Sequence, residues 1–145
     1  MSKKTTYLRE QRDRALFDAY CKAIQERSFR SQDEATDYVR THEAPRFYIS
    51  PEFCMLIMGR LSRGQDSGIK GKAATRKFQE LFRRYVIEWK KPESRDLDIY
   101  DICSRIVSQP APEFYINNRA ARGIIQRQKK IRQEEWERKR ERSLQ

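Results

Sequence analysis

The sequence contains little of what catalysis, metal binding and disulfide-stabilised folds require. Its 145 residues include one histidine and three cysteines, Cys21, Cys54 and Cys103, which lie far apart and form no Cys-x-x-Cys pair. This spacing predicts neither a zinc site nor a disulfide framework, and we expect each cysteine to lie reduced in a helical core. We also find no nucleophile with a plausible base and no glycine-rich phosphate loop. We therefore expect a protein that is not an enzyme and binds no cofactor.

Acidic residues do not gather in the number that a metal-dependent nuclease needs. Asp96, Asp98 and Asp101 form the one carboxylate cluster of the sequence. Binding of Mg²⁺ is one interpretation of this cluster, because carboxylate oxygens are frequent ligands of that ion. Capping of a helix that begins near Asp98 explains the same residues with fewer assumptions, so we expect no metal site.

Long apolar runs are absent as well. No run approaches the roughly 20 residues that span a bilayer. The basic start of the chain, residues 1–4, is not followed by the apolar stretch of a secretory signal. We therefore expect a cytoplasmic protein that does not associate with membranes.

Negative charge is scarce relative to positive charge. The chain has 32 Lys and Arg against 21 Asp and Glu, a formal net charge of +11. Hydrophobic residues make up only 37%, which predicts a thin core, but 11% aromatics favour a packed one. A field this positive attracts polyanions, and nucleic acid is the polyanion that a basic protein of this kind most often binds.

One short motif occurs twice in the chain. Residues 44–50 read Ala-Pro-Arg-Phe-Tyr-Ile-Ser, and residues 111–117 read Ala-Pro-Glu-Phe-Tyr-Ile-Asn. Upstream, the pattern Leu-Phe-x-x-Tyr occurs at residues 16–20 and again at 81–85. The two copies of the motif lie two residues further apart than the two copies of the upstream pattern. This difference indicates a two-residue insertion between the pattern and the motif in the second copy. Similarity of this kind indicates a duplicated unit.

Each copy of the unit predicts three helices. The first helices are predicted over 7–26 and from residue 73, because apolar residues recur there at three- and four-residue spacing. Second helices are expected at 31–42 and 98–108. A third helix follows each copy of the motif. We therefore predict an all-α fold of two tandem three-helix, helix-turn-helix-like repeats with a charged C-terminal helical extension. The predicted parts are a first repeat (1–63), a flexible basic linker (64–72), a second repeat (73–130) and a charged helical tail (131–145).

Two resemblances follow from these elements. Three helices whose last two are joined by a connector resemble helix-turn-helix modules, which implies DNA binding through the third helix. The Ala-Pro-x-Phe-Tyr-Ile motif is similar to segments of small uncharacterised proteins from bacterial phages and mobile elements. That second resemblance covers most of each repeat and implies no known activity.

The third helix of the second repeat carries the residue types that contact nucleic acid. Arg pairs with guanine edges, Asn or Gln with adenine, and Lys with phosphate. At 100° per residue one side of the helix holds Asn118, Arg119, Arg122, Gln126, Lys129 and Lys130. An ordinary solvated face of a surface helix is the alternative interpretation. Further phosphate contacts are predicted for Lys70, Lys72, Arg76, Lys77, Arg83 and Arg84.

The third helix of the first repeat is apolar on almost every side. Over residues 51–61 it includes Phe53, Met55, Leu56, Ile57 and Met58. Such a helix is buried, either between the two units or in a homo-oligomeric or other protein interface. Its repeat is a poor candidate for reading bases.

The two Phe-Tyr pairs of the motif admit two interpretations. Exposed aromatic side chains beside basic residues stack on unpaired bases. Aromatics that recur at fixed positions in a thin core are more often packing residues, and we favour that interpretation for Phe47, Tyr48, Phe114 and Tyr115.

The sequence thus favours a non-enzymatic protein that binds double-stranded DNA, as a regulator or accessory factor of a bacterial phage or mobile element. The alternative is a structural or adaptor protein of a virion or packaging complex, which would bind protein partners through helix 51–61. Single-stranded nucleic acid becomes a candidate only if the Phe-Tyr pairs are exposed.

Overall fold

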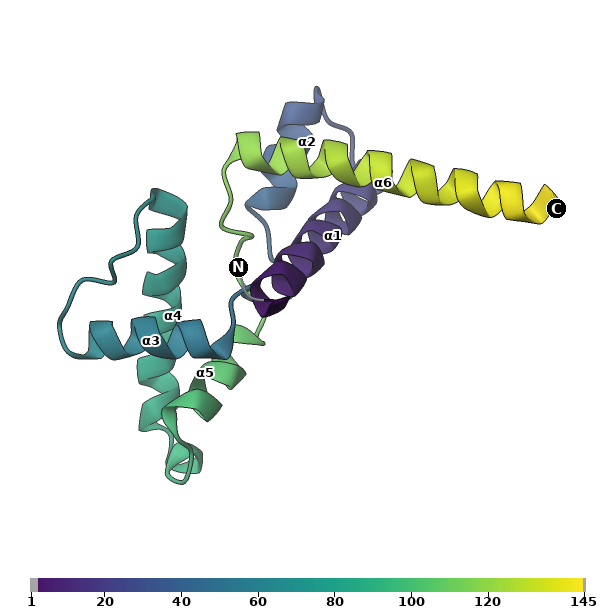
Figure 1. Cartoon of the computed structure of the whole chain (residues 1–145). Helices are drawn as coiled ribbons and strands as arrows, with labels where there is room; N and C mark the ends of the chain where they lie inside the picture. Colours follow the sequence, from purple (N-terminus) through teal and green to yellow (C-terminus); the bar gives the residue numbers. More distant parts are fainter. Residues whose placement is uncertain (1–2, 145) are drawn as a thin grey trace.

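The computed structural model of the chain describes the backbone of residues 3–144 and the side chains of residues 6–144. The described part is helical, as predicted (Figure 1). Its elements are α1 (Lys3–Glu26), α2 (Gln32–Arg40), α3 (Pro51–Ser62), α4 (Lys72–Lys90), the short 3-10 helix η1 (Pro92–Ser94), α5 (Ile99–Val107) and α6 (Asn118–Leu144).

Short polar residues define where several helices begin. Ser31 and Ser50 each accept a hydrogen bond from the backbone N–H three residues later, at the start of α2 and α3. Asn117 does the same at the start of α6, over 2.8 Å. Asp98 and Asp101 form a reciprocal capping box on α5, which confirms capping as the role of these two carboxylates. At the starts of α2, α3, α5 and α6, one of the free N–H groups of the first turn is therefore paired with a capping side chain.

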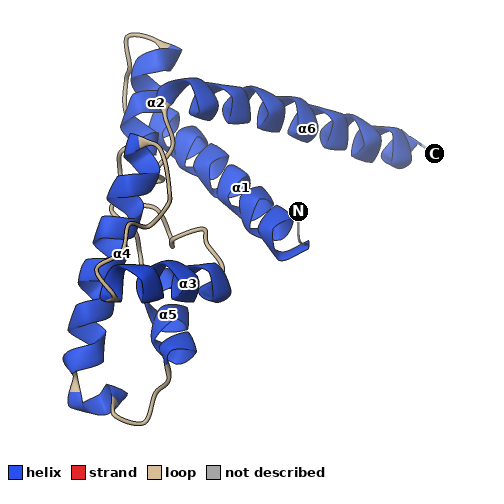
Figure 2. Cartoon of the chain, turned by 60° about the vertical axis from the view of Figure 1, so that its left-hand side comes forward, coloured by secondary structure: helices blue, strands red, loops and turns tan. Residues whose placement is uncertain are grey.

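The helices group in an order that differs from their order along the chain. The structure packs α1, α2 and α6 together, which we call the first bundle, and α3, α4 and α5 together, the second bundle. The two groups form separate arms of the molecule (Figures 1 and 2). The sequence led us to expect each repeat, 1–63 and 73–130, to pack on its own. Instead, the third helix of each repeat packs against the first two helices of the other repeat.

The exchange takes place where two connectors cross. These are the first connector (residues 44–50) and the second connector (residues 111–117). Ala44 N–H donates to Ala111 O over 2.8 Å, and Ala111 N–H donates back to Ala44 O over 2.9 Å. Phe47 N–H donates to Val107 O, and Phe114 N–H donates to Arg40 O. Every one of these partners has its counterpart at the matching position of the other repeat, so the crossing has an approximate two-fold symmetry.

Aromatic side chains pack across the same crossing. Phe47 stacks on Tyr115 with ring centres 6.0 Å apart, and Tyr48 stacks on Phe114 at 6.3 Å. Both phenylalanines are buried and both tyrosines are half-buried. The packing interpretation of the Phe-Tyr pairs is therefore confirmed. The structure gives no support to stacking of these rings on unpaired bases.

Matching positions form the centre of each bundle. Ile57 of α3 and Ile124 of α6 are both buried and follow their connectors at the same distance along the chain. Next to Ile57, the thiols of Cys54 and Cys103 meet across the interface of α3 and α5 and are free of disulfide. The neighbouring Cys103 thiol and burial raise the pKa of Cys54. Each fully buried Ile or Leu side chain of such a core contributes about 1.5–3 kcal/mol to folding.

The segment 64–72, expected to be a flexible linker between two units, is an ordered loop within the second bundle. It joins α3 to α4, which pack against each other. Arg60 donates to Ser67 O over 2.9 Å, Gly68 N–H donates to Asp66 over 3.1 Å, and Ile69 packs on the core. Gly64 and Gly68 have positive φ, at 72° and 77°, which side chains other than glycine rarely adopt.

The expected charged tail, 131–145, continues α6 without a break as far as Leu144; Gln145 lies outside the described residues. Every residue from Lys129 to Leu144 is exposed, and the end of the helix projects from the first bundle (Figure 1). Over the described range, no helix has both the length and the apolar character needed to cross a membrane.

We predict that Phe47→Ala destabilises the whole protein, because Phe47 holds the crossing on which both bundles depend. The expected loss is about 3–5 kcal/mol of unfolding free energy, measured by urea titration. Trp136→Ala, on the projecting half of α6, is the control and should change stability by less than about 0.5 kcal/mol. A loss below about 1 kcal/mol, or unfolding in which only one bundle responds to Phe47→Ala, contradicts this role of the crossing.

Candidate nucleic-acid interface

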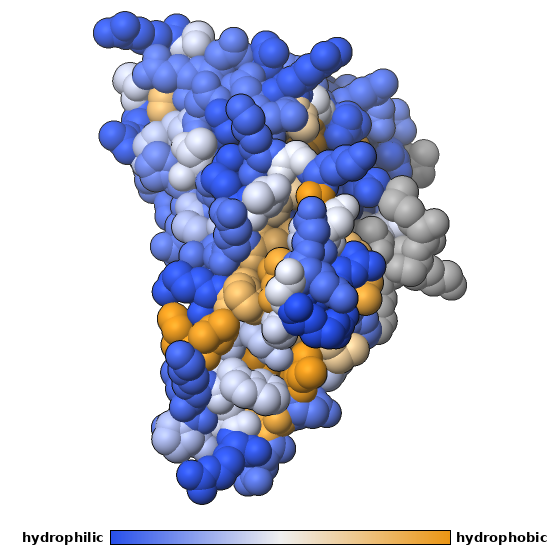
Figure 3. Space-filling view, turned by 90° about the vertical axis from the view of Figure 1, so that its left-hand side faces the viewer, coloured by the Kyte–Doolittle hydropathy of each residue, from blue (hydrophilic) through white to orange (hydrophobic). Residues whose placement is uncertain are grey.

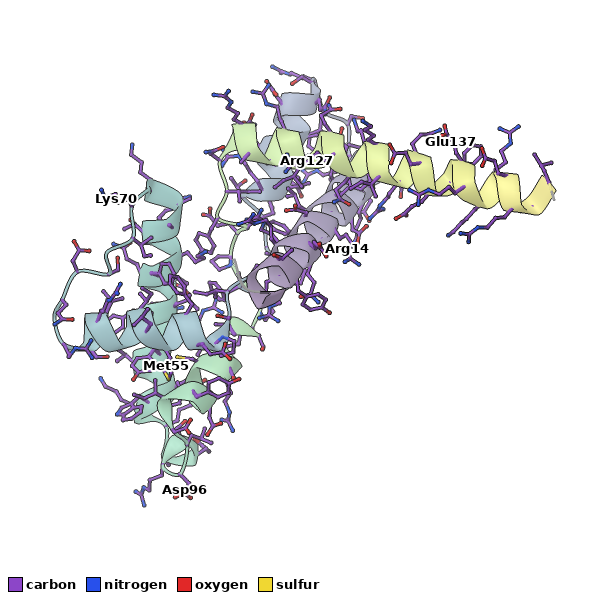
Figure 4. All side chains as sticks on the ribbon, viewed as in Figure 1. Arg14, Met55, Lys70, Asp96, Arg127 and Glu137 are labelled. Carbon is purple, nitrogen blue, oxygen red and sulfur yellow. The ribbon has the colours of Figure 1, made fainter. Side chains whose placement is uncertain are left out.

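Helix α6 has two halves with different surroundings. Its first half packs on α1 and α2 through Ala121, Ile124 and Ile125. Arg132, which pairs with Asp18 of α1, marks the end of this contact, and the helix then extends into solvent. Figure 4 labels Arg127 near the packed half and Glu137 on the projecting half. The helix has ten basic and four acidic residues, which makes it the most strongly basic helix of the chain.

Two of the predicted base-contacting residues are held by acidic residues of α2. Asn118 donates from Nδ2 to Asp37 over 2.7 Å, and Arg122 forms an ion pair with Asp33 at 3.1 Å. Hydrogen bonds from Arg40 and from Asn118 lower the pKa of Asp37. Both side chains thus help to fix α6 on α2, and the charge of Arg122 is partly neutralised.

Three other predicted residues face outward without a partner. Arg119, Gln126 and Lys130 follow one another at seven- and four-residue spacing, which places them within about 40° of one line along the helix. Among the described residues none of the three makes a side-chain hydrogen bond or ion pair, and all are exposed. We call this row, continued by Gln133 and Arg140 on the projecting half, the outward stripe.

The outward stripe carries one acidic residue. Glu137 accepts a hydrogen bond from Gln133 over 3.0 Å. Arg140 lies 5.5 Å from the centre of the Trp136 ring. Lys129, at the edge of the stripe, stands 5.4 Å over the Tyr20 ring of α1.

We did not include Gln133 and Arg140 in the prediction from the sequence, because we ended the predicted nucleic-acid-binding side of this helix at residue 130. The absence of Gly and Pro after Gly123 is the signal that extends the helix and its face.

The remaining predicted residues lie on the second bundle and are not gathered with the stripe. Lys70 and Lys72 are exposed at the start of α4, where Lys70 points into solvent (Figure 4). Arg76 pairs with Glu113 at 2.9 Å, and Arg83 and Arg84 both pair with Glu80. These two arginines lower the pKa of Glu80, chiefly through the hydrogen bond from Arg83.

Arg84 belongs to the crossing of the connectors. It also donates to Pro110 O over 2.9 Å, and its guanidinium lies 4.8 Å over the Phe47 ring. Lys77 is half-buried between the two bundles beside Phe78, 5.3 Å from the ring centre. Of the six basic residues predicted around α4, only Lys70 and Lys72 are thus exposed and without an acidic partner in the described part of the chain.

The carboxylates that suggested a metal ion do not assemble into a site. Within residues 6–144 no three side chains of His, Cys, Asp or Glu are placed to hold a metal ion together. Asp96 is exposed at the tip of the second bundle (Figure 4), while Asp98 and Asp101 cap α5.

No protein-family model matches the sequence, and neither a curated protein nor a solved structure matches the chain. The charge and the geometry of α6 and α4 are therefore the basis for assigning a function.

We predict that Asn118→Ala raises the pKa of the Asp37 carboxyl group, because it removes one of two hydrogen bonds that favour the charged form. The measurement is an NMR titration of the Asp37 carboxyl carbon. Since the folded-state pKa is lowered, the stabilisation from Asp37 is complete above the unfolded-state pKa. It is lost as the pH falls through the folded-state pKa. Arg127→Ala, on the same helix, is the control; an equal effect of both variants would contradict the contact.

Proposed function

We propose that the protein binds double-stranded DNA without catalysing a reaction, and that the outward stripe of α6 is its main contact surface. The observation that carries the proposal is the row of Arg119, Gln126 and Lys130. It is exposed, has no partner in the described chain and lies on a helix that projects from its bundle. A role as regulator or accessory factor of a phage or mobile element is part of the same proposal.

The dimensions and chemistry of α6 support this function. A helix of 27 residues is about 40 Å long, and the major groove of B-DNA, about 12 Å wide, admits an α-helix. Arginine and glutamine side chains match guanine and adenine edges, while lysines pair with phosphates. The first half of α6 packs on α1 and α2 through buried side chains and also contacts Asp33 and Asp37, so the stripe is presented on a packed helix.

Lys70 and Lys72 offer a second place for phosphate contacts. They lie at the start of α4, on the other bundle, and are exposed. Lys129 flanks the stripe and would add a contact to the DNA backbone. Asn118 and Arg122 are held by Asp37 and Asp33, and Arg76, Arg83 and Arg84 by glutamates of this chain, so we leave these five residues out of the proposed interface.

We predict that Arg119→Gln with Lys130→Gln weakens binding of a duplex of roughly 20 base pairs, measured by fluorescence anisotropy at rising salt. Each lost phosphate contact should reduce the slope of log K against log salt by about 0.9, because fewer counterions are released. If Arg119 contacts a base, its substitution should cost a further loss of about 1–3 kcal/mol in binding free energy for the preferred DNA sequence.

The matched control carries the same loss of charge on the opposite side of the same helix. Lys139→Gln with Arg142→Gln lies about 100° or more away from the stripe, and both residues are exposed. The control should leave affinity closer to that of the unchanged protein. Equal affinity in the two double variants contradicts the stripe. An affinity that responds neither to salt nor to these substitutions contradicts DNA binding itself.

Exposed apolar side chains on α3 favour a second candidate function, the binding of protein partners. Phe53, Met55 and Leu56 are 39%, 37% and 48% exposed, whereas Met58 is fully buried. The helix is thus buried within the chain on one side only, so of the two expected alternatives, burial between the units or in a protein interface, the exposed side leaves room for the second. Figure 3 shows an apolar band on the face of the molecule formed by α3 and α4, bordered by hydrophilic residues. Such patches mark interaction surfaces.

We predict that the protein self-associates through this patch and that Leu56→Glu abolishes the association, because a buried carboxylate has no partner there. Sedimentation velocity over a range of concentrations measures it. Ile131→Glu, which places the same charge on the exposed part of α6, is the control and should associate as the unchanged protein does. A monomer at all concentrations excludes the patch as a self-association surface.

A further inference from the structure

Lys77 stands out among the basic residues near the junction of the two bundles. Its ammonium group makes no hydrogen bond or ion pair with any described side chain, and it lies 5.3 Å from the centre of the Phe78 ring. Burial lowers the pKa of Lys77, and the positive charge of Arg12 lowers it further. A half-buried cation without an anion is costly unless something else supplies the negative charge.

The other cations in this region already have partners. Arg12 forms an ion pair with Asp13 at 3.0 Å. Arg46 donates from Nε to Phe47 O over 3.1 Å, with its guanidinium over the Tyr48 ring. Lys77 differs from both arginines because it has neither a carboxylate, as Arg12 has, nor a backbone carbonyl acceptor, as Arg46 has, among the described residues.

The two repeats differ in the residue that follows this cation. Arg12 and Lys77 occupy matching positions in the two repeats, as do Asp13 and Phe78. In the first repeat the residue after the cation is the carboxylate that neutralises it. In the second repeat that residue is a buried phenylalanine. The second repeat thus has an apolar side chain where the first has an internal counter-charge.

A cavity of about 370 Å³ lies beside Lys77. It opens where α1, the first connector and the starts of α3 and α4 meet, and one side of it is open to solvent. Its apolar lining comes from Leu8, Ile49, Phe53, Ile69, Ala74 and Phe78. The volume falls within the roughly 300–1,000 Å³ of small-molecule sites, which combine an apolar lining with a few polar groups that orient the ligand.

We propose that this cavity binds a small amphipathic carboxylate, with its apolar chain against the lining of Leu8, Phe53 and Phe78 and its carboxylate on the Lys77 ammonium group. The size of the cavity suits a chain of about eight carbons. A carboxylate supplies the counter-charge that Asp13 supplies to Arg12, and the apolar chain removes the lining from water. This site lies apart from the outward stripe, so it stands or falls independently of DNA binding.

The test uses octanoate and octan-1-ol as probes on the full chain, with binding measured by isothermal titration calorimetry. Octanoate should bind at one saturable site. Lys77→Met should weaken octanoate binding by at least about tenfold, because the charge-assisted hydrogen bonds are lost. It should leave octan-1-ol binding unchanged. Lys90→Met, at the far end of the same helix, is the matched control and should bind both probes as the unchanged protein does.

Two further measurements locate the chain of the ligand. Hexanoate should bind about tenfold more weakly than octanoate, since two buried methylenes are missing. Ala74→Phe fills the cavity and should abolish binding of both probes, with thermal unfolding used to verify that the variant is folded. Amide shifts in ¹H–¹⁵N spectra on addition of octanoate should centre on Ala74 and Phe78.

Several results would overturn the proposal. They are equal octanoate affinity in the unchanged protein and Lys77→Met, the absence of saturable binding, or amide shifts centred away from the cavity. If Ala74→Phe fails to fold, the comparison of hexanoate with octanoate in the unchanged protein decides whether an apolar chain is buried.

Discussion

The paired crossing of the two connectors is the constraint on which the rest of the structure depends. Ala44 and Ala111 exchange two backbone hydrogen bonds in a buried setting, where an unpaired N–H or C=O would be costly. The same crossing directs α3 into one bundle and α6 into the other. Each bundle contains one helix that reaches it through this crossing, so the two arms depend on each other structurally.

The crossing is nearly symmetric but not fully so. Tyr115 adopts a positive φ of 58°, a conformation that is uncommon for residues other than glycine, whereas Tyr48 at the matching position does not. Burial, together with the nearby charge of Glu113, raises the pKa of Tyr115 to about 12. Its strained backbone persists because the stacked Phe47 ring and the neighbouring backbone hydrogen bonds fix the connector on both sides.

The exchange of third helices also decides which surfaces the protein presents. It places the basic α6 against Asp33 and Asp37 of α2, which neutralise one edge of the helix and leave the outward stripe free. It places the apolar α3 against α4 and α5, which bury Cys54, Ile57 and Met58 but leave Phe53 and Leu56 at the surface. The helices that follow the two copies of the motif thus present different surfaces, a charged one on α6 and a partly apolar one on α3.

Features that depend on neighbouring residues in the chain were predictable from the sequence. The caps at Ser50, Asp98 and Asn117 act within one helical turn, and helical periodicity depends on residues three and four apart, so no tertiary information is needed. The match of residues 44–50 to 111–117 likewise indicated that the Phe-Tyr pairs pack in equivalent places. The all-helical class, most helix positions and the role of these rings follow from such local patterns.

Only the tertiary structure decided which helices pack together and which charges stay free. An apolar helical face specifies that a helix is buried, but the similar faces of the two repeats do not specify against which partner. The pairing of Asn118 with Asp37, 81 residues apart, and the isolation of Lys77 beside Phe78 both follow from that choice. Composition determined that the chain is strongly basic. The crossing of the two connectors determined which positive charges stay unpaired, namely those of the outward stripe, which face solvent, and that of Lys77, which lies beside an apolar cavity.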